Sequence, residues 1–127
     1  MSERAINSYR DLQVWQDGMA LAETCYRLAK DLPREELFAM SSQIRRSASS
    51  VPANIAEGHG RENTQSFIQY LRIAQGSLKE LETHLLLSAR VGLLTESHLK
   101  SPLDQSAILG KKLRSLIRSL QQRATKR

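Results

Sequence analysis

Hydrophobic residues recur at alternating steps of three and four along most of the chain, which is typical of helices with one buried face. The pattern predicts helices over residues 8–30, 35–57, 64–90 and 96–122. Few stretches alternate hydrophobic and polar residues with period two, so strands are not expected. The connections are short, which favours antiparallel packing of consecutive helices. We therefore predict an all-α fold with a single domain over residues 1–127, an antiparallel up-down-up-down four-helix bundle.

The first predicted helix carries two hydrophobic rows. The first row has the three-and-four spacing of a buried stripe, and its members are Leu12, Trp15, Met19, Ala22, Tyr26 and Ala29. A second row widens this face, with members Val14, Leu21, Cys25 and Leu28. We expect the first row to be the buried stripe and the helix to contact two neighbours.

Residues that begin or end helices lie at several of the predicted boundaries. Ser8 and Asp11 have the spacing of a capping box, and Asn63 is placed to cap the third helix. Gly92 is expected to end that helix. After Leu120 the chain is polar and basic, and we expect a frayed end there.

The second predicted helix contains an unusual combination of residues. Pro52 lies inside it, where a proline removes one backbone hydrogen bond and bends a helix. Gly58 and Gly60 are expected to end it, because glycine readily adopts positive φ.

A polar stripe also follows the second helix, centred about 120° from its apolar row. Its members are Gln43, Arg46, Ser50, Asn54 and Glu57. This geometry turns the stripe largely away from the bundle. It is either a solvated face or a contact with a second copy of the protein, in which Arg46 and Glu57 would form directional hydrogen bonds.

The net charge of +6 is concentrated at the C-terminal end. Seven of the 19 Lys and Arg residues lie in residues 105–127, which contain no acid, so residues 1–104 carry 12 bases against 13 acids. Such asymmetry indicates a polyanionic partner. Alternatively, the cations stabilise the C-terminal end of a helix and keep the protein soluble. Candidate nucleic-acid-binding residues are Lys111, Lys112, Arg114, Arg118 and Arg123. Lys111, Arg114 and Arg118 form an outward stripe suited to phosphates rather than to base reading.

Patterns typical of catalysis or metal binding are absent from the sequence. No Glu precedes a His by three residues, no two His are four apart, and neither a Walker loop nor a Gly-x-Ser-x-Gly elbow occurs. His59 beside Glu57 is an acid–base pair or, as we favour, part of a polar turn. We expect no enzymatic activity, no metal, no cofactor and no small-molecule substrate.

The single cysteine, Cys25, excludes an internal disulfide and indicates a reducing compartment. The first ten residues lack the apolar region of a signal peptide, and no apolar run is long enough to cross a bilayer. These features predict a cytoplasmic protein with no membrane partner.

Three stretches carry a specific resemblance: YRDLQVWQDGMAL, QIRRSASSVPANIAEGHGR and FIQYLRIAQGSLKELETHL. With the combined pattern VWQ, QIRR, NIAEGxGR and GSxxEL, residues 9–94 resemble the bacterial four-helix bundle family of 23S ribosomal RNA intervening-sequence proteins. The resemblance implies a ring-like homopentamer. A related branch, the accessory variability determinant proteins of diversity-generating retroelements, binds RNA and a reverse transcriptase.

Six residues match the family motif directly, which favours an interprotomer or structural role over simple solvation. They are Gln43, Arg45, Arg46, Asn54, Glu57 and Arg61.

Two functional hypotheses remain at this point. The first is a non-enzymatic oligomeric bundle that binds RNA or DNA through its basic surface without sequence preference, with the link to rRNA intervening sequences that the resemblance implies. The alternative is a protein-interaction scaffold with no nucleic-acid role.

Overall fold

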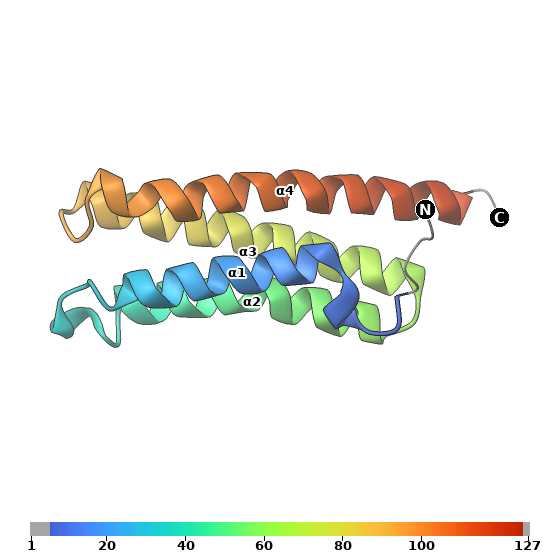
Figure 1. Cartoon of the computed structure of the whole chain (residues 1–127), viewed down its shortest axis with the longest axis horizontal. Coiled ribbons are helices and arrows are strands. Elements are labelled where there is room, and N and C mark those ends of the chain that lie inside the picture. Colours follow the sequence, from blue (N-terminus) through green and yellow to red (C-terminus); the bar gives the residue numbers. More distant parts are fainter. Residues whose placement is uncertain (1–5, 126–127) are drawn as a thin grey trace.

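A computed structural model describes residues 6–125 of the chain. Within them, two short 3-10 turns accompany four long helices: η1 (Tyr9–Asp11), α1 (Gln13–Ala29), η2 (Arg34–Glu36), α2 (Met40–Gly60), α3 (Thr64–Arg90) and α4 (Glu96–Thr125). The helices run up and down in turn, and α1 and α3 each contact both α2 and α4 (Figure 1). The predicted all-α four-helix bundle is confirmed.

The core lies along the central axis of the bundle and draws on all four helices. Its largest completely buried aliphatic side chains are Leu21, Ile44, Ile55, Leu71, Leu78, Leu81, Leu85, Leu109 and Leu113. Burying each such side chain contributes about 1.5–3 kcal/mol of hydrophobic stabilisation. The three-and-four spacing of the sequence places these residues on one face of each helix.

The buried row of α1 differs from the expected one. Val14, Leu21, Cys25 and Leu28 of the second row face the core, whereas 37% of Met19 and 46% of Tyr26 remain exposed. Ala22 and Ala29 are buried, and Trp15 is half-buried at the margin of the core. Both rows satisfy helical periodicity, so the rotation of α1 against its neighbours decides which of them enters the interior.

The helix-boundary residues perform most of the predicted roles. Ser8 and Asp11 form a capping box, but it begins η1 rather than α1. The extended backbone of Leu12 separates these two helices. Asn63 Oδ1 accepts the Ser66 N–H at 2.9 Å and caps α3. Gly92, with φ of +83°, follows the end of α3 as expected.

Of the two glycines predicted to end α2, Gly58 lies inside the helix and Gly60 is its last residue, and neither adopts positive φ. The helix continues through Gly60, and the positive φ of +56° falls on Glu62. Gly58 serves packing instead, because a Cβ on it would lie 2.5 Å from Cβ of Tyr70. The absence of a side chain there lets α2 and α3 approach closely.

Both internal prolines are buried within continuous helices. Pro52 of α2 faces Gly18 of α1, where an added Cβ would lie 3.4 Å from Cβ of Pro52. Pro102 lies within α4, which continues to Thr125, so the expected fraying after Leu120 is not seen. The last two basic residues, Lys126 and Arg127, lie outside the described residues.

Candidate nucleic-acid interface

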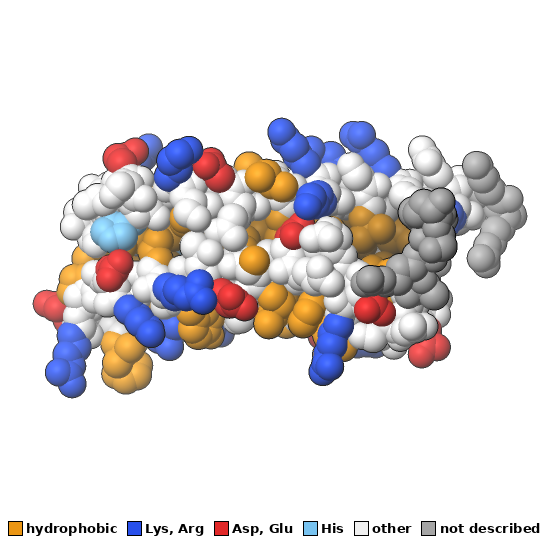
Figure 2. All heavy atoms as spheres, viewed as in Figure 1, with side chains coloured by type: hydrophobic (Ala, Val, Ile, Leu, Met, Phe, Trp, Pro, Cys, Tyr) orange, Lys and Arg blue, Asp and Glu red, His pale blue; other side chains and the backbone are white. Residues whose placement is uncertain are grey.

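The basic stripe of α4 lies on the outer surface of the bundle. Lys111, Arg114 and Arg118 are exposed, while Leu113 and Ile117 between them point into the core. In the part of the chain that the structure describes, these three cations form no ion pair. Figure 2 shows Lys and Arg side chains projecting from the upper edge of the molecule, where Figure 1 places α4. The stripe therefore offers charges to a partner.

The other two predicted basic residues do not join this stripe. Lys112 Nζ lies 2.7 Å from Oδ2 of Asp17, so its charge is paired with α1. Arg123 lines a hollow near the end of the bundle, together with His59 and Phe67. The predicted set of five thus divides into one free stripe and two separately placed residues.

A groove of about 570 Å³ between α3 and α4 adds polar residues that the sequence analysis missed. Its lining residues are Gln65, Ile68, Gln69, Arg72, Gln121, Ala124 and Thr125. The spacing of Gln65, Gln69 and Arg72, four and three residues apart, is the signal that could have revealed them.

The register of α3 against α4 brings this groove beside the basic stripe. Ser106 Oγ donates to Oε2 of Glu82 at 2.6 Å, which aligns the two antiparallel helices. Counting along both helices from this pair places Arg72 at the level between Arg114 and Arg118. Gln121 of the groove follows Arg118 by three residues, so the groove and the stripe lie next to each other on one face of α4.

The family-motif residues at the end of α2 contact α3 within the same protomer. Tyr70 Oη donates to Oε2 of Glu57 at 3.2 Å, and Nη2 of Arg61 donates to the same carboxylate oxygen at 3.2 Å. Nη2 of Arg61 also lies 2.7 Å from Tyr70 Oη. The hydrogen bond to Glu57 raises the pKa of Arg61. This triad joins α2 to α3 at an exposed edge.

Two turns earlier along α2, the hydroxyls of Ser50 and Ser77 make a second link between α2 and α3. The Oγ atoms of Ser50 and Ser77 lie 2.8 Å apart, and Asn54 Nδ2 donates to the Ser50 carbonyl at 2.8 Å. The expectation that the stripe faces away from its own bundle is therefore wrong for Ser50 and Glu57. Close packing at Gly58 brings α3 over this side of α2.

The remaining motif residues lie near the start of α2. Arg45 donates to the carbonyl oxygens of Ser41 and Leu37, both at 3.2 Å, and so ties the connection before α2 to the helix. Gln43 and Arg46 are exposed. Their role between protomers stays a prediction.

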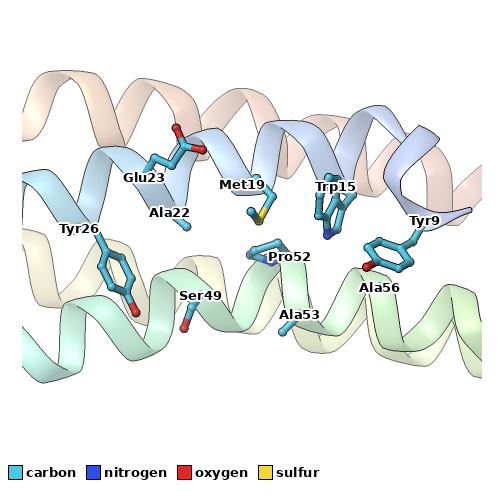
Figure 3. A pocket seen from close by; sticks show the side chains of 10 residues that line it. All are labelled: Tyr9, Trp15, Met19, Ala22, Glu23, Tyr26, Ser49, Pro52, Ala53 and Ala56. Atoms are coloured by element: carbon cyan, nitrogen blue, oxygen red, sulfur yellow. The ribbon is translucent and has the colours of Figure 1, made fainter.

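An apolar groove of about 530 Å³ lies between α1 and α2, on the first row of α1, in which Met19 and Tyr26 remain exposed. It is lined by Tyr9, Trp15, Met19, Ala22, Glu23, Tyr26, Ser49, Pro52, Ala53 and Ala56. Figure 3 shows Trp15, Met19 and Tyr26 pointing from α1 toward α2. Glu23 is the sole charged residue of this lining. Apolar surface of this kind is common at protein interfaces.

His59 and Glu57, which were considered as an acid–base pair, each interact with other residues. The ring of His59 packs edge-on against Phe67, with centroids 5.6 Å apart, while Glu57 bonds to Arg61 and Tyr70. Among residues 6–125, no three His, Cys, Asp or Glu side chains gather as a metal site. No described helix combines the length and apolar character that crossing a bilayer requires.

Comparison with known proteins places this geometry in context. The family described as 23S rRNA-intervening sequence protein matches residues 10–115. A solved structure from Bacteroides thetaiotaomicron, a protein of unknown function from the S23 ribosomal protein family, is similar with a TM-score of 0.76 and 33% identity. The match covers 82% of this chain and 97% of that one. No curated protein matches.

Proposed function

The chain belongs to the 23S rRNA-intervening sequence protein family, and on that premise we propose that it is a non-enzymatic, homo-oligomeric protein that binds RNA or DNA. The observation that carries the proposal is the exposed stripe of Lys111, Arg114 and Arg118, whose charges are not used in ion pairs within the described residues. Arg72 of the neighbouring helix extends it.

The stripe suits the phosphate backbone rather than particular bases. Long flexible cations contact phosphates without reading sequence, and each neutralised phosphate releases counterions. Binding is therefore tolerant of sequence and weakens steeply as salt rises. A single helix offers only a few such contacts, so the affinity of one protomer is modest.

Assembly would multiply these weak contacts. Repeating the stripe on each protomer of a ring, such as the homopentamer that the resemblance implies, raises affinity through multivalency. The apolar groove between α1 and α2 offers one side of a contact between copies. Exposed apolar side chains along one face of α3 and at its C-cap, outside that groove, offer a second and different side: Ile73, Leu87 and Val91. Two unlike surfaces are what a head-to-tail ring requires.

The test is a fluorescence-anisotropy titration of a structured RNA hairpin at low and near-physiological salt. Full-length protein should bind at low salt and lose affinity steeply at higher salt. The triple variant Lys111→Ala, Arg114→Ala, Arg118→Ala should bind far more weakly, with helicity and assembly unchanged by circular dichroism and sedimentation. Unchanged affinity of this variant would mean that the stripe is the wrong surface.

The apolar groove also favours a second candidate function, a scaffold that docks a protein partner. Trp15, Met19 and Tyr26 form an amphipathic aromatic and thioether surface of the kind common at protein interfaces. Capture of partners with and without nuclease treatment separates the two functions. Partners released by nuclease support nucleic-acid binding, and protein partners that persist support the scaffold.

A further inference from the structure

The groove between α3 and α4 has a lining that phosphate contact alone does not require. Three glutamines, Gln65, Gln69 and Gln121, line it together with Arg72 and Thr125. Ile68 and Ala124 supply its apolar surface. No carboxylate lines it. The volume of about 570 Å³ lies within the range of small-ligand sites.

Most polar groups of the groove are available for a ligand, although the Thr125 hydroxyl already donates to the Gln122 carbonyl oxygen at 3.0 Å. Within residues 6–125, no side-chain hydrogen bond or ion pair is formed by Gln65, Gln69, Arg72 or Gln121. Other polar residues of α3 are bonded internally: Tyr70 to Glu57, Ser77 to Ser50, and Glu82 to Ser106. The amides are therefore left as unused donors and acceptors on two rigid helices.

Amide groups match the chemistry of nucleobase edges. A glutamine offers one acceptor and two donors in a plane, which lets it bond two neighbouring atoms of a base. Base pairing covers the Watson–Crick edge of a base, and a base stacked in a duplex cannot enter a recess between two helices, whereas an unpaired base can be turned out into it. Arg72 is placed to hold the flanking phosphate, and the basic stripe of Arg114 and Arg118 continues the path of the backbone.

We infer that this groove, which we call the amide groove, binds an unpaired nucleotide of the nucleic acid that the basic stripe holds. This inference rests on the proposed function and adds a preference for unpaired segments over duplex. No aromatic side chain lines the groove. Recognition therefore depends on hydrogen bonds to the base and apolar contact with Ile68, not on stacking.

The experiment compares two probes of equal phosphate number, a hairpin with a single-stranded loop and a blunt duplex, each made in RNA and in DNA. The proteins are full-length wild type, the variant Gln65→Ala with Gln121→Ala, and the control Gln122→Ala. Gln122 is exposed on α4 and lies outside the groove lining. Circular dichroism confirms that each variant keeps its helicity.

Wild type and the Gln122→Ala control should prefer the loop over the duplex by about tenfold, the effect of one good amide–base contact. The double variant should lose this preference and keep its affinity for the duplex. Equal binding of loop and duplex by wild type, or a preference that survives in the double variant, would overturn the amide groove and leave the basic stripe intact. If no probe binds at low salt, the proposed function itself fails, and the inference with it. The RNA and DNA arms show which nucleic acid is preferred.

Discussion

The Lys112 Nζ atom lies 2.7 Å from Oδ2 of Asp17, although the two residues are 95 positions apart in the chain. This pair joins α4 to α1 on the side of α4 away from Arg114. It separates Lys112 from its neighbour Lys111, whose side chain is free for a partner. Of two adjacent lysines, Lys112 is therefore paired within the protein, whereas Lys111 forms no ion pair among the described residues.

Replacing each lysine by alanine should expose this difference. Lys111→Ala should lower the slope of log affinity against log salt by about 0.9, the value for one lost contact with a duplex DNA phosphate. Lys112→Ala should leave that slope unchanged, because its charge is already paired. It should cost about 0.2–1 kcal/mol of folding free energy, as for other partly exposed ion pairs. Salt titrations and urea unfolding measure the two effects, and equal slopes for both variants would contradict the assignment.

Gly58 and Gly76 are both inside helices, and replacing each by alanine compares a crowded position with an open one. Gly58→Ala should destabilise the protein by about 1–3 kcal/mol, because the new Cβ would lie 2.5 Å from Cβ of Tyr70 and force α2 and α3 apart. Gly76→Ala meets nothing within 4 Å and should stabilise it by about 0.5–1 kcal/mol, through the higher helix propensity of alanine. Urea midpoints measure both. A stabilising Gly58→Ala would show that α3 can move without cost.

The apolar groove should govern self-association. Met19→Lys places a charge in the middle of the groove, between Trp15 and Tyr26 and beside Pro52, and should reduce the sedimentation coefficient toward that of the monomer (Figure 3). Ala20→Lys, the next residue on the same helix, lies outside this groove and should leave assembly unchanged. Trp15, the only tryptophan, should also shift its emission on dilution as the groove becomes hydrated. A Met19→Lys protein that sediments like wild type would move the interface elsewhere.

Burial should make Cys25, the single cysteine of the chain, unreactive in the folded protein. Complete burial of Cys25 in the core raises the pKa of its thiol to about 12. The native protein should therefore react very slowly with a disulfide reagent at pH 8, and quickly once unfolded in urea. Since the pKa is raised by folding, the stability it supports is complete below the unfolded thiol's ordinary pKa of about 8.5 and declines as pH rises toward 12. Cys25→Ser would serve as the unreactive control, and rapid native labelling would contradict the burial.

Local sequence pattern was sufficient for the helices and for the basic stripe. The third helix was predicted at Thr64–Arg90, where it is found, because Asn63 and Gly92 signal its ends locally. The end of α2 was predicted three residues early because Gly58, inside the helix, carries the same local signal as a terminating glycine. What distinguishes Gly58 is the Cβ of Tyr70, which no local pattern contains.

The sequence by itself determined the number of helices, the end of α1, both ends of α3, the start of α4 and the concentration of charge in α4. These properties depend on periodicity and on residues a few positions apart. Tertiary structure decided which apolar row of α1 enters the core, that Glu57 and Ser50 bond to α3, and that Gln65, Gln121 and Arg72 share a groove. The reason is that these outcomes depend on the rotation and register of each helix against its neighbours, and two rows of similar residues satisfy the same helical period equally well.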